Sequence, residues 1–561
     1  MRVLLLQLCR MGDVIQTLPL VDALIARGDE VHLLLHESMR PLPLTRPGLE
    51  LHFVSLPTSP SEPPPNGTVT QCLKRLEAIG FDTSVNLSFD EPSALIATYL
   101  ETPVRLGLSV GRDRRTRALD PWTVYLLCLP ERRRQGPFNL VQVYGHLTGV
   151  RIGPEQHQHI VPSDSRPPEP LEELRDSDQP APRIGLVPGA SDTRKRWPSI
   201  RFAELAERLR SLGHSVCLLG SPDERPLGDA IVHALGDGAG PGVVYDWIGK
   251  TDLEQLCEIL RTLDLVITND TGTMHLAAAL GVKTLTVTLG PAHVFESAPF
   301  ASGHLTVESE MACHPCEFAS YCPDPECGPA IPSDAVAELA LDALEGRSPS
   351  LPPADGYRGF VSEFDDQGRL VQKPLARYPL STSETVRAAY ENLWERALHA
   401  PQPVRSAEEI AASLVSHWDV TDLGSLNVDL ARMQRHLEDL VATMQQGTDS
   451  LLELTVTGEE PAGRLATLTK QLEEKVDLAG RIEPNLAPLT SASLMQLSMA
   501  GGRNPGRALM DMLSVLSGGL DRGRLFLDLV QRLRRAFAST GDSRPIHSRA
   551  DGSSQSVGKR I

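Results

Sequence analysis

The sequence of 561 residues has no excess of positive charge and no long apolar run. Its 54 Lys and Arg residues face 72 Asp and Glu residues, which gives a formal net charge of −18 at pH 7. A chain so acidic has no general attraction to nucleic acid or anionic lipid, so nucleic acid is not an expected partner. No window holds the roughly 18 consecutive apolar residues of a transmembrane helix. The apolar start resembles a signal peptide only briefly, because Gln7, Arg10 and Asp13 interrupt it.

Cysteine is also scarce. Nine cysteines are too few for a disulfide scaffold, which favours a cytoplasmic location. A cluster of four is compatible with a structural metal site, with disulfides or with unligated thiols, and its spacing matches no standard zinc or iron–sulfur pattern. The four are Cys313, Cys316, Cys322 and Cys327.

Two regions of the chain alternate short apolar runs with helical patterns. In residues 1–165 this gives strands at 3–8, 31–35 and 81–87 and a helix at 14–26. A linker rich in Pro and acidic residues follows at 166–182. The alternation resumes in residues 183–350, with strands at 183–187, 216–219, 265–268 and 284–288 and helices at 252–262 and 334–344. Such alternation predicts an α/β fold of two doubly wound, Rossmann-like domains that face a cleft.

The pattern of apolar and polar residues changes from about residue 351, where runs typical of strands almost vanish. Apolar residues at spacings of three and four predict helices at 383–399, 407–416, 427–446, 462–477 and 506–538. Residues 351–540 are therefore expected to form a helical extension. The polar, Ser- and Gly-rich residues 541–561 are expected to be disordered.

Two turns after predicted strands carry candidate catalytic groups. Asp13 follows Gly12 at the start of the first helix, where the helix dipole favours an ionised carboxylate. It is a candidate general base, and the alternative is a residue that only starts the helix. In the second turn, Ser191 and Lys195 suit an anion such as a phosphate, and the alternative is a solvated basic loop. The segment from Gly220 to Glu224, after the next strand, repeats this geometry, and a carboxylate there could bind ribose hydroxyls.

The segment from Asn269 to His275 is the sharpest feature. A β-branched strand runs into Asp270, Thr271 and Gly272 and then into an Ala-rich helix. Backbone N–H groups of such a turn point at a diphosphate on the helix N-terminus, and His275 lies one turn further on. There is no Gly-x-x-x-x-Gly-Lys loop, which argues against P-loop chemistry.

Basic residues are concentrated between residues 105 and 134, where eight arginines stand against three acidic residues. This local positive charge suits an anionic acceptor, and the alternative is an ordinary solvated face. The arginines are Arg105, Arg112, Arg114, Arg115, Arg117, Arg132, Arg133 and Arg134.

These motifs, in this order, resemble those of glycosyltransferase family 9, the ADP-heptose:lipopolysaccharide heptosyltransferases. The resemblance covers residues 1 to about 346 and none of the helical extension. It is carried by Met11-Gly-Asp-Val14 with Thr17-Leu-Pro19, by Lys195-Arg-Trp-Pro198 and by Asp270-Thr-Gly-Thr-Met-His275.

The resemblance implies a GT-B fold and an inverting transfer of a sugar, in most members heptose from ADP-heptose, to a hydroxyl of a lipopolysaccharide core or a related anionic surface glycan. It implies no cofactor for catalysis and a cytoplasmic enzyme in peripheral contact with the inner membrane. It assigns Asp13 as the catalytic base and Lys195 to the departing diphosphate. It assigns the donor to Ser191, Glu224, Asp270, Thr271, Gly272 and His275.

Two other functions stay open. One is a catalytically degenerate GT-B scaffold, against which the filled positions Asp13, Lys195, Asp270, Gly272 and His275 argue. The other is a GT-B nucleotide-sugar epimerase or hydrolase, which would form product from the donor alone.

Overall fold

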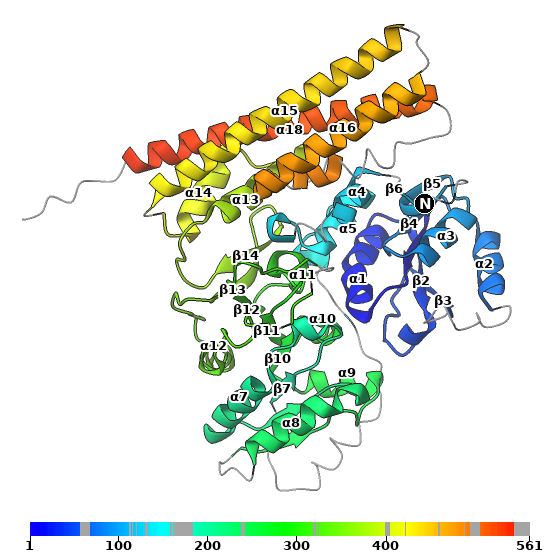
Figure 1. Ribbon diagram of the computed structural model, residues 1–561. Helices are drawn as coiled ribbons and strands as arrows, with labels where there is room; N and C mark the ends of the chain where they lie inside the picture. Colours follow the sequence, from blue (N-terminus) through cyan, green and yellow to red (C-terminus); the bar gives the residue numbers. More distant parts are fainter. Residues whose placement is uncertain are drawn as a thin grey trace, which may run out of the picture.

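The computed structural model consists of two α/β domains and a helical region (Figure 1). The expected linker 166–182 and residues 543–561 of the expected disordered tail lie outside the described residues. The structure describes residues 1–56, 68–111, 114, 116–118, 120–128, 133–156, 160, 183–236, 242–317, 321–323, 325–398, 404–420, 422–457, 461–486, 488–493 and 505–542.

The first domain is built on a six-stranded sheet whose central strand is buried on both faces. Alternate residues of β1 point to opposite faces, so Val3 and Leu5 pack with α1 and α5 while Leu4 and Leu6 pack with α2 and α3. The strand order is β3-β2-β1-β4-β5-β6, and all neighbouring pairs are parallel except β5 with β6. The strands are β1 (Arg2–Gln7), β2 (Glu30–His36), β3 (Leu49–Val54), β4 (Thr83–Asn86), β5 (Val104–Val110) and β6 (Thr116–Ala118), and the helices are α1 (Met11–Ala26), α2 (Thr68–Ile79), α3 (Glu91–Tyr99), α4 (Pro121–Cys128) and α5 (Leu140–Thr148).

The second domain carries an eight-stranded sheet of order β14-β13-β12-β11-β10-β7-β8-β9. Its strands from β7 to β12 pair in parallel. Those strands are β7 (Ile184–Val187), β8 (Val216–Leu218), β9 (Val244–Asp246), β10 (Leu265–Asn269), β11 (Lys283–Thr288) and β12 (Leu305–Ser309), and the helices are α7 (Ser199–Ser211), α8 (Arg225–Leu235), α9 (Leu253–Arg261), α10 (Gly272–Ala279), α11 (Val294–Ser297) and α12 (Ser333–Glu345).

Both sheets have the doubly wound strand order: successive strands are added outward on one side of the first strand, and the chain then returns to add strands on the other side. This change of side lies between β1 and β4 in the first domain and between β7 and β10 in the second. Loops that leave such a point open a crevice at the carboxyl ends of the strands, where ligands bind in this class of fold. The predicted α/β fold of two Rossmann-like domains is therefore confirmed, and it places the loops after β1, β7, β8 and β10 where a site is expected.

The prediction that strands nearly disappear after residue 351 is wrong for one segment. The hairpin of β13 (Tyr357–Phe364) and β14 (Leu370–Pro374) pairs antiparallel with β12 and extends the second sheet. β13 alternates apolar and polar residues only in part, and its pairing partner lies about 50 residues earlier in the chain, so the local pattern gave little signal.

The remaining predicted helices are confirmed, and some are longer than predicted. In Figure 1 the three longest run side by side as an elongated layer above the two domains. Among helices in the described part of the chain, none is long and apolar enough to cross a membrane. The helices are α13 (Thr382–Ala397), α14 (Ala407–His417), α15 (Leu423–Thr457), α16 (Pro461–Ile482) and α18 (Pro505–Asp542).

The helical region is joined to both domains through buried contacts. On the first domain, the Trp122 indole donates to the Leu398 carbonyl over 3.2 Å, and the Tyr125 ring meets the Trp394 ring edge-on. On the second domain, Arg358 of β13 lies between Glu308 of β12 and Glu384 of α13, at 3.2 and 2.9 Å.

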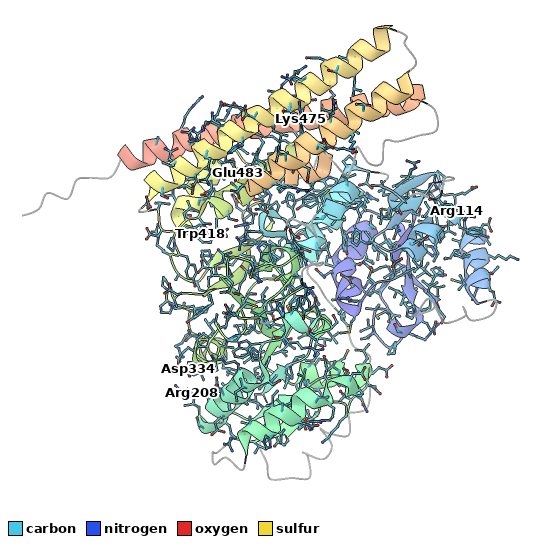
Figure 2. The ribbon with its side chains drawn as sticks, in the orientation of Figure 1. Arg114, Arg208, Asp334, Trp418, Lys475 and Glu483 are labelled. Atoms are coloured by element: carbon cyan, nitrogen blue, oxygen red, sulfur yellow. The ribbon has the colours of Figure 1, made fainter. Side chains whose placement is uncertain are left out.

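Arg358 also lies over the ring of Trp418, which Figure 2 shows where the helices meet the second domain. Buried charges are tolerated only when they are paired, so this network fixes α13 to the sheet.

Acid should weaken this network. Burial alone would raise the pKa of Glu384, but the guanidinium groups of Arg387 and Arg358 outweigh it and lower the pKa to about 2. A carboxylate with a lowered folded pKa stabilises the protein above its unfolded pKa, near 4.5, and loses that contribution as pH falls towards 2.

We therefore expect Glu384→Gln to lower the free energy of unfolding by about 3–5 kcal/mol at pH 7 and to flatten its decline between pH 4.5 and 2, as measured by denaturant unfolding. Glu363→Gln is the matched control, because Glu363 and its ion-pair partner Lys373, 3.6 Å away, are both half-exposed and a solvated pair contributes little to stability. Equal effects of the two substitutions would contradict the assignment.

Candidate functional site

A cavity of about 440 Å³ opens between the two domains at the carboxyl ends of β1, β7, β8 and β10. Its size is that of an ordinary small-molecule site. Four of the predicted donor-binding residues line it: Ser191, Glu224, Thr271 and Gly272. The other predicted site residues, Asp13, Lys195, Asp270 and His275, are not part of its lining and lie beside it.

The N-termini of α1 and α10 meet across the domain boundary through two glycines. A Cβ atom on Gly12 would lie 3.1 Å from Cδ2 of His275 and 3.4 Å from Cα of Gly272. A Cβ atom on Gly272 would lie 2.8 Å from the end of Met11 and 3.3 Å from the backbone nitrogen of Gly12. The absence of side chains thus lets two helix N-termini approach one cavity. Each brings the N–H groups of its first turn and the positive end of a helix dipole, which together favour an anion.

Asp13 is a partly buried carboxylate in the first turn of α1. Its Oδ2 accepts a hydrogen bond from the backbone N–H of Arg10 over 3.3 Å. We expected the helix dipole to dominate its ionisation, but burial dominates. Burial raises the pKa of Asp13, and the hydrogen bond and charge of Arg10 and the charge of Lys195 offset this only in part. A carboxylate with a raised pKa is a stronger base, which general-base catalysis near neutral pH requires.

Lys195 and Asp270 form an ion pair at the other side of the cleft. The Lys195 ammonium lies 2.7 Å from Oδ1 of Asp270, and the Ser297 hydroxyl donates to Oδ2. Burial alone would raise the pKa of Asp270, but Lys195 and Ser297 outweigh it and lower the pKa. Asp270 is therefore an ionised anchor that fixes the ammonium of Lys195.

His275 is buried at the meeting point of the two helices. Burial lowers its pKa to about 4, and the charge of Asp270 opposes this only in part. The ring is therefore neutral at pH 7, so it can donate a single N–H but cannot supply a positive charge to a phosphate.

Arg10 is a cleft residue that the sequence motifs did not single out. Its guanidinium lines the cavity and donates to Oγ of Ser191 over 3.1 Å, which joins the first domain to the second. Its position directly before the Met11-Gly-Asp turn was the available signal. A guanidinium suits the oxygens of a phosphate.

Glu224 reaches the cavity from the loop after β8. Its Oε2 accepts from the backbone N–H of Ser221 over 2.8 Å, so it also caps the short helix 222–224. A Cβ atom on Gly189 would lie 1.8 Å from Oε1 of Glu224. Glycine at 189 is therefore what leaves room for this carboxylate.

Asn269 organises the loops around the cleft and was also missed. This fully buried amide donates to the carbonyls of Pro188 and Gly189 over 2.9 and 3.2 Å and accepts from the backbone N–H of Trp197 over 2.9 Å. It thereby fixes the ends of the loop that carries Lys195. An amide at the last position of a buried strand was the only local signal.

The arginine-rich segment is divided between structural and exposed roles. Arg133 forms a buried ion pair with Glu296, and Arg134 donates to the backbone carbonyls of Met311 and His314. These two arginines join the domains, so the expectation that they belong to a solvated or acceptor-binding face is wrong. Arg105 and Arg114 are exposed, and Figure 2 shows Arg114 on the outer side of the first domain. Arg112, Arg115 and Arg132 lie outside the described residues.

All nine cysteines fall within the described part of the chain, and none forms a disulfide. Burial raises the pKa of the Cys316 and Cys327 thiols, and the neighbouring thiols of Cys313 and Cys322 raise it further. Among described residues they do not form a group of three ligand atoms close enough to hold one ion.

Residues 69–317 match the model of glycosyltransferase family 9 (heptosyltransferase). The match begins in α2 and ends after β12, so it includes Lys195 and Asp270 but not Asp13. The chain is 39% identical over 111 residues to lipooligosaccharide heptosyltransferase 2 of Haemophilus influenzae, which is 20% of this chain and 32% of that protein. It is 27% identical over 324 residues to lipopolysaccharide heptosyltransferase 1 of Pseudomonas aeruginosa, which is 56% of this chain and 86% of that protein. The chain thus spans about a third of the first relative.

Two solved structures are similar to part of the chain. The family 9 glycosyl transferase from Veillonella parvula superposes with a TM-score of 0.47 at 20% identity, over 62% of this chain and 97% of that one. The ADP-heptose lps heptosyltransferase II of E. coli superposes with a TM-score of 0.45 at 21% identity, over 62% of this chain and 99% of that one.

The glycine contact can be tested by stability alone. Valine at 272 would force its side chain against Met11 and the backbone of Gly12, so we expect Gly272→Val to lower the free energy of unfolding by about 1–3 kcal/mol. Gly424→Val is the control, because the nearest atom to a Cβ there is 3.7 Å away. If denaturant unfolding shows the same small change for both variants, the two helix ends do not meet as described.

Proposed function

We propose that the chain, whose residues 69–317 match the model of glycosyltransferase family 9, is an inverting glycosyltransferase that moves heptose from ADP-heptose to a hydroxyl of a lipopolysaccharide core or related surface glycan. One observation carries the proposal. Two helix N-termini and Arg10 converge on a cavity flanked by Lys195 and by the partly buried carboxylate of Asp13. Heptose is proposed because the curated relatives are heptosyltransferases.

The donor is proposed to lie with its diphosphate on the starts of α1 and α10. The N–H groups of these helices, the Arg10 guanidinium and the hydroxyls of Ser191 and Thr271 supply donors for its oxygens. The nucleoside then extends along the apolar wall that includes Leu219, Leu253 and Leu256. Glu224, on the same wall, is proposed to accept from the ribose hydroxyls.

The chemical step follows from these positions. The acceptor hydroxyl gives its proton to Asp13 while its oxygen forms a bond to the anomeric carbon. The bond from that carbon to the diphosphate oxygen breaks, and its electron pair leaves with the diphosphate. Lys195 and the helix N–H groups stabilise this developing charge, which is generally the largest contribution to such a reaction. Asp270 holds Lys195 in place through their 2.7 Å ion pair. No cofactor enters the proposed step.

The acceptor is proposed to bind on the first domain, residues 1–165, opposite the nucleotide-binding second domain, residues 183–350. Arg105 and Arg114 give the exposed side of the first domain positive charge that suits an anionic glycan. Because a lipopolysaccharide acceptor is anchored in a membrane, we propose peripheral contact with the cytoplasmic face of the inner membrane.

A structural metal at Cys313, Cys316, Cys322 and Cys327 stays a prediction. Its support is the presence of four thiols within 15 residues of sequence. It requires the segment to contract, because among described residues no three of these ligands lie within reach of one ion. Metal analysis of the purified chain, compared with a Cys313→Ser and Cys316→Ser variant, tests it.

Removal of the proposed base is the first test. We expect Asp13→Asn, which keeps the shape of the side chain, to lower kcat by about 10²- to 10⁴-fold in a glycosyl transfer assay. The affinity for the donor should change by no more than about tenfold. Because the pKa of Asp13 is raised, wild-type kcat/KM should fall with decreasing pH at a higher pH than an ordinary Asp would give, and the variant should lose this limb.

Asp22→Asn is the matched control, since Asp22 lies further along the same helix, where it pairs with Arg46. Unchanged turnover of Asp13→Asn would remove the base assignment. Product formed from the donor alone, without acceptor, would favour an epimerase or hydrolase.

Removal of the proposed leaving-group cation is the second test. We expect Lys195→Met to lower kcat by about 10²- to 10³-fold. It also leaves Asp270 buried and unpaired, so stability should fall. The double variant Lys195→Met with Asp270→Asn should regain stability but not turnover, which separates catalysis from folding. Lys283→Met, at the exposed start of β11, is the control. A double variant with restored turnover would show that Lys195 acts only as the partner of Asp270.

A further inference from the structure

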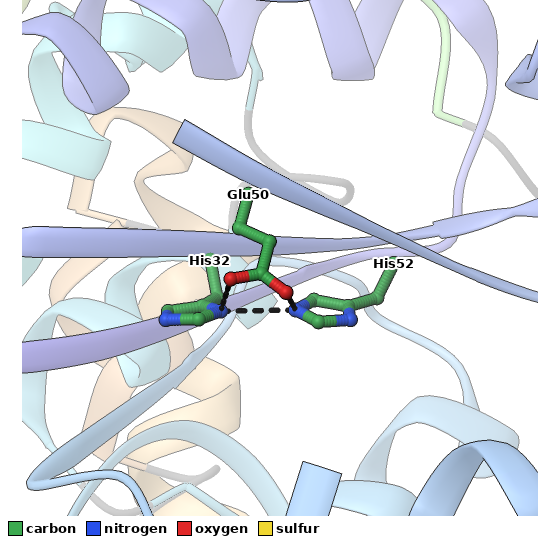
Figure 3. Close-up of side chains that lie close together, drawn as sticks. All are labelled: His32, Glu50 and His52. Atoms are coloured by element: carbon green, nitrogen blue, oxygen red, sulfur yellow. Dashed lines mark hydrogen bonds and ion pairs between the residues drawn. The ribbon is translucent and has the colours of Figure 1, made fainter. Parts of the chain in front are cut away.

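Two histidines and a glutamate come together on β2 and β3, at the edge of the first sheet and away from the cleft. His32 pairs with Glu50 in the register of the two strands, and His52 lies two residues beyond Glu50 on the same face. Figure 3 shows the imidazole rings of His32 and His52 side by side with the carboxylate of Glu50 above them. The ring atoms Nδ1 of His32 and Nε2 of His52 are 2.9 Å apart, and the Glu50 oxygens are 3.6 Å from the first and 3.8 Å from the second.

The hydrogen bonds around His32 leave an unshared electron pair facing this group. The other ring nitrogen of His32 lies 3.1 Å from the carboxylate of Glu30, which can only accept. A proton on that nitrogen is donated to Glu30, and Nδ1 is then an acceptor. His52 has one proton to offer at most on Nε2, yet Nδ1 of His32 and Glu50 both face that atom.

Two imidazoles and a carboxylate are the ligand types that Zn²⁺ and its neighbours prefer.

We propose that His32, Glu50 and His52 form a binding site for a divalent transition-metal ion, best suited to Zn²⁺, that fastens the edge strand β3 to β2. Four ligands at the usual 2.0–2.1 Å from zinc are about 3.3 Å apart, and the three separations lie on both sides of that value.

The surroundings resemble those of a working metal site. The hydrogen bond from His32 to Glu30 is the arrangement that orients metal-bound histidines and strengthens them as ligands. The Phe81 ring packs edge-on against His32 and shields it from solvent. Glu50 is exposed, so solvent can provide a fourth ligand. Among described residues this is the one group of three such ligand atoms within 4.8 Å of one another.

The test is Zn²⁺ binding to the full chain after removal of metals with a chelator and under reducing conditions. Zinc added alone should bind saturably, and Glu50→Gln and His52→Gln should each bind one ion fewer per chain. Glu30→Gln should keep the stoichiometry and weaken the affinity about 10- to 100-fold. His36→Gln, on the same strand but bonded to Ser38, should bind as the wild type does.

The four clustered cysteines are unchanged in all these variants, so any zinc they hold cancels in the comparison. The X-ray absorption spectrum of the zinc-loaded wild type, minus that of a ligand variant, reports on the ion that the variant does not bind. This difference should show nitrogen and oxygen ligands and no sulfur. Unfolding curves of the metal-free variants should match that of the metal-free wild type, which excludes misfolding as the cause. Wild-type protein that binds no zinc, or equal binding by the wild type and both ligand variants, would overturn the proposal.

Discussion

The contact between Gly12 and Gly272 is the constraint on which the site depends. The two glycines begin helices in different domains, and only residues without side chains allow these helix ends to approach so closely. The approach brings Asp13 and Arg10 of the first domain close to Lys195 and Asp270 of the second. An anion in the cavity would therefore contact both domains at once.

The two domains contribute carboxylates whose pKa values are shifted in opposite directions. The second domain holds an ionised pair, because the pKa of Asp270 is lowered and Lys195 is fixed beside it. The first domain holds a carboxylate with a raised pKa, since desolvation at Asp13 outweighs the charges of Arg10 and Lys195. Two carboxylates with opposite shifts in one cleft suit opposite roles: one anchors a cation and the other accepts a proton.

The helical region adds a second connection between the domains. Trp122 joins it to the first domain, and the Glu308–Arg358–Glu384 network joins it to the second. Motion of one domain against the other must therefore be accommodated by contacts with α13 as well as by the cleft. Because the charges of this network are buried, the connection weakens when acid protonates its carboxylates.

Much of the fold and of the site could be predicted because the signals are local. Short apolar runs located the central parallel strands but not β3, β5, β9 and β12. Turns after strands located Asp13, Lys195 and the 270–275 segment near one cleft. What escaped prediction depends on contacts between distant segments. The Arg10–Ser191 and Asn269–Pro188 bonds, the pairing of β13 with β12 and the dominance of burial over the helix dipole at Asp13 each require the folded chain. The roles of the site residues themselves stay predictions.

Calorimetric titration of the full chain with ADP, UDP and GDP, each as free nucleotide and as sugar conjugate, tests the central claim most directly. The account predicts saturable binding with a clear preference for ADP and ADP-heptose. Absence of binding by every one of these nucleotides would contradict it, because the converging helix N-termini would then not form a diphosphate site.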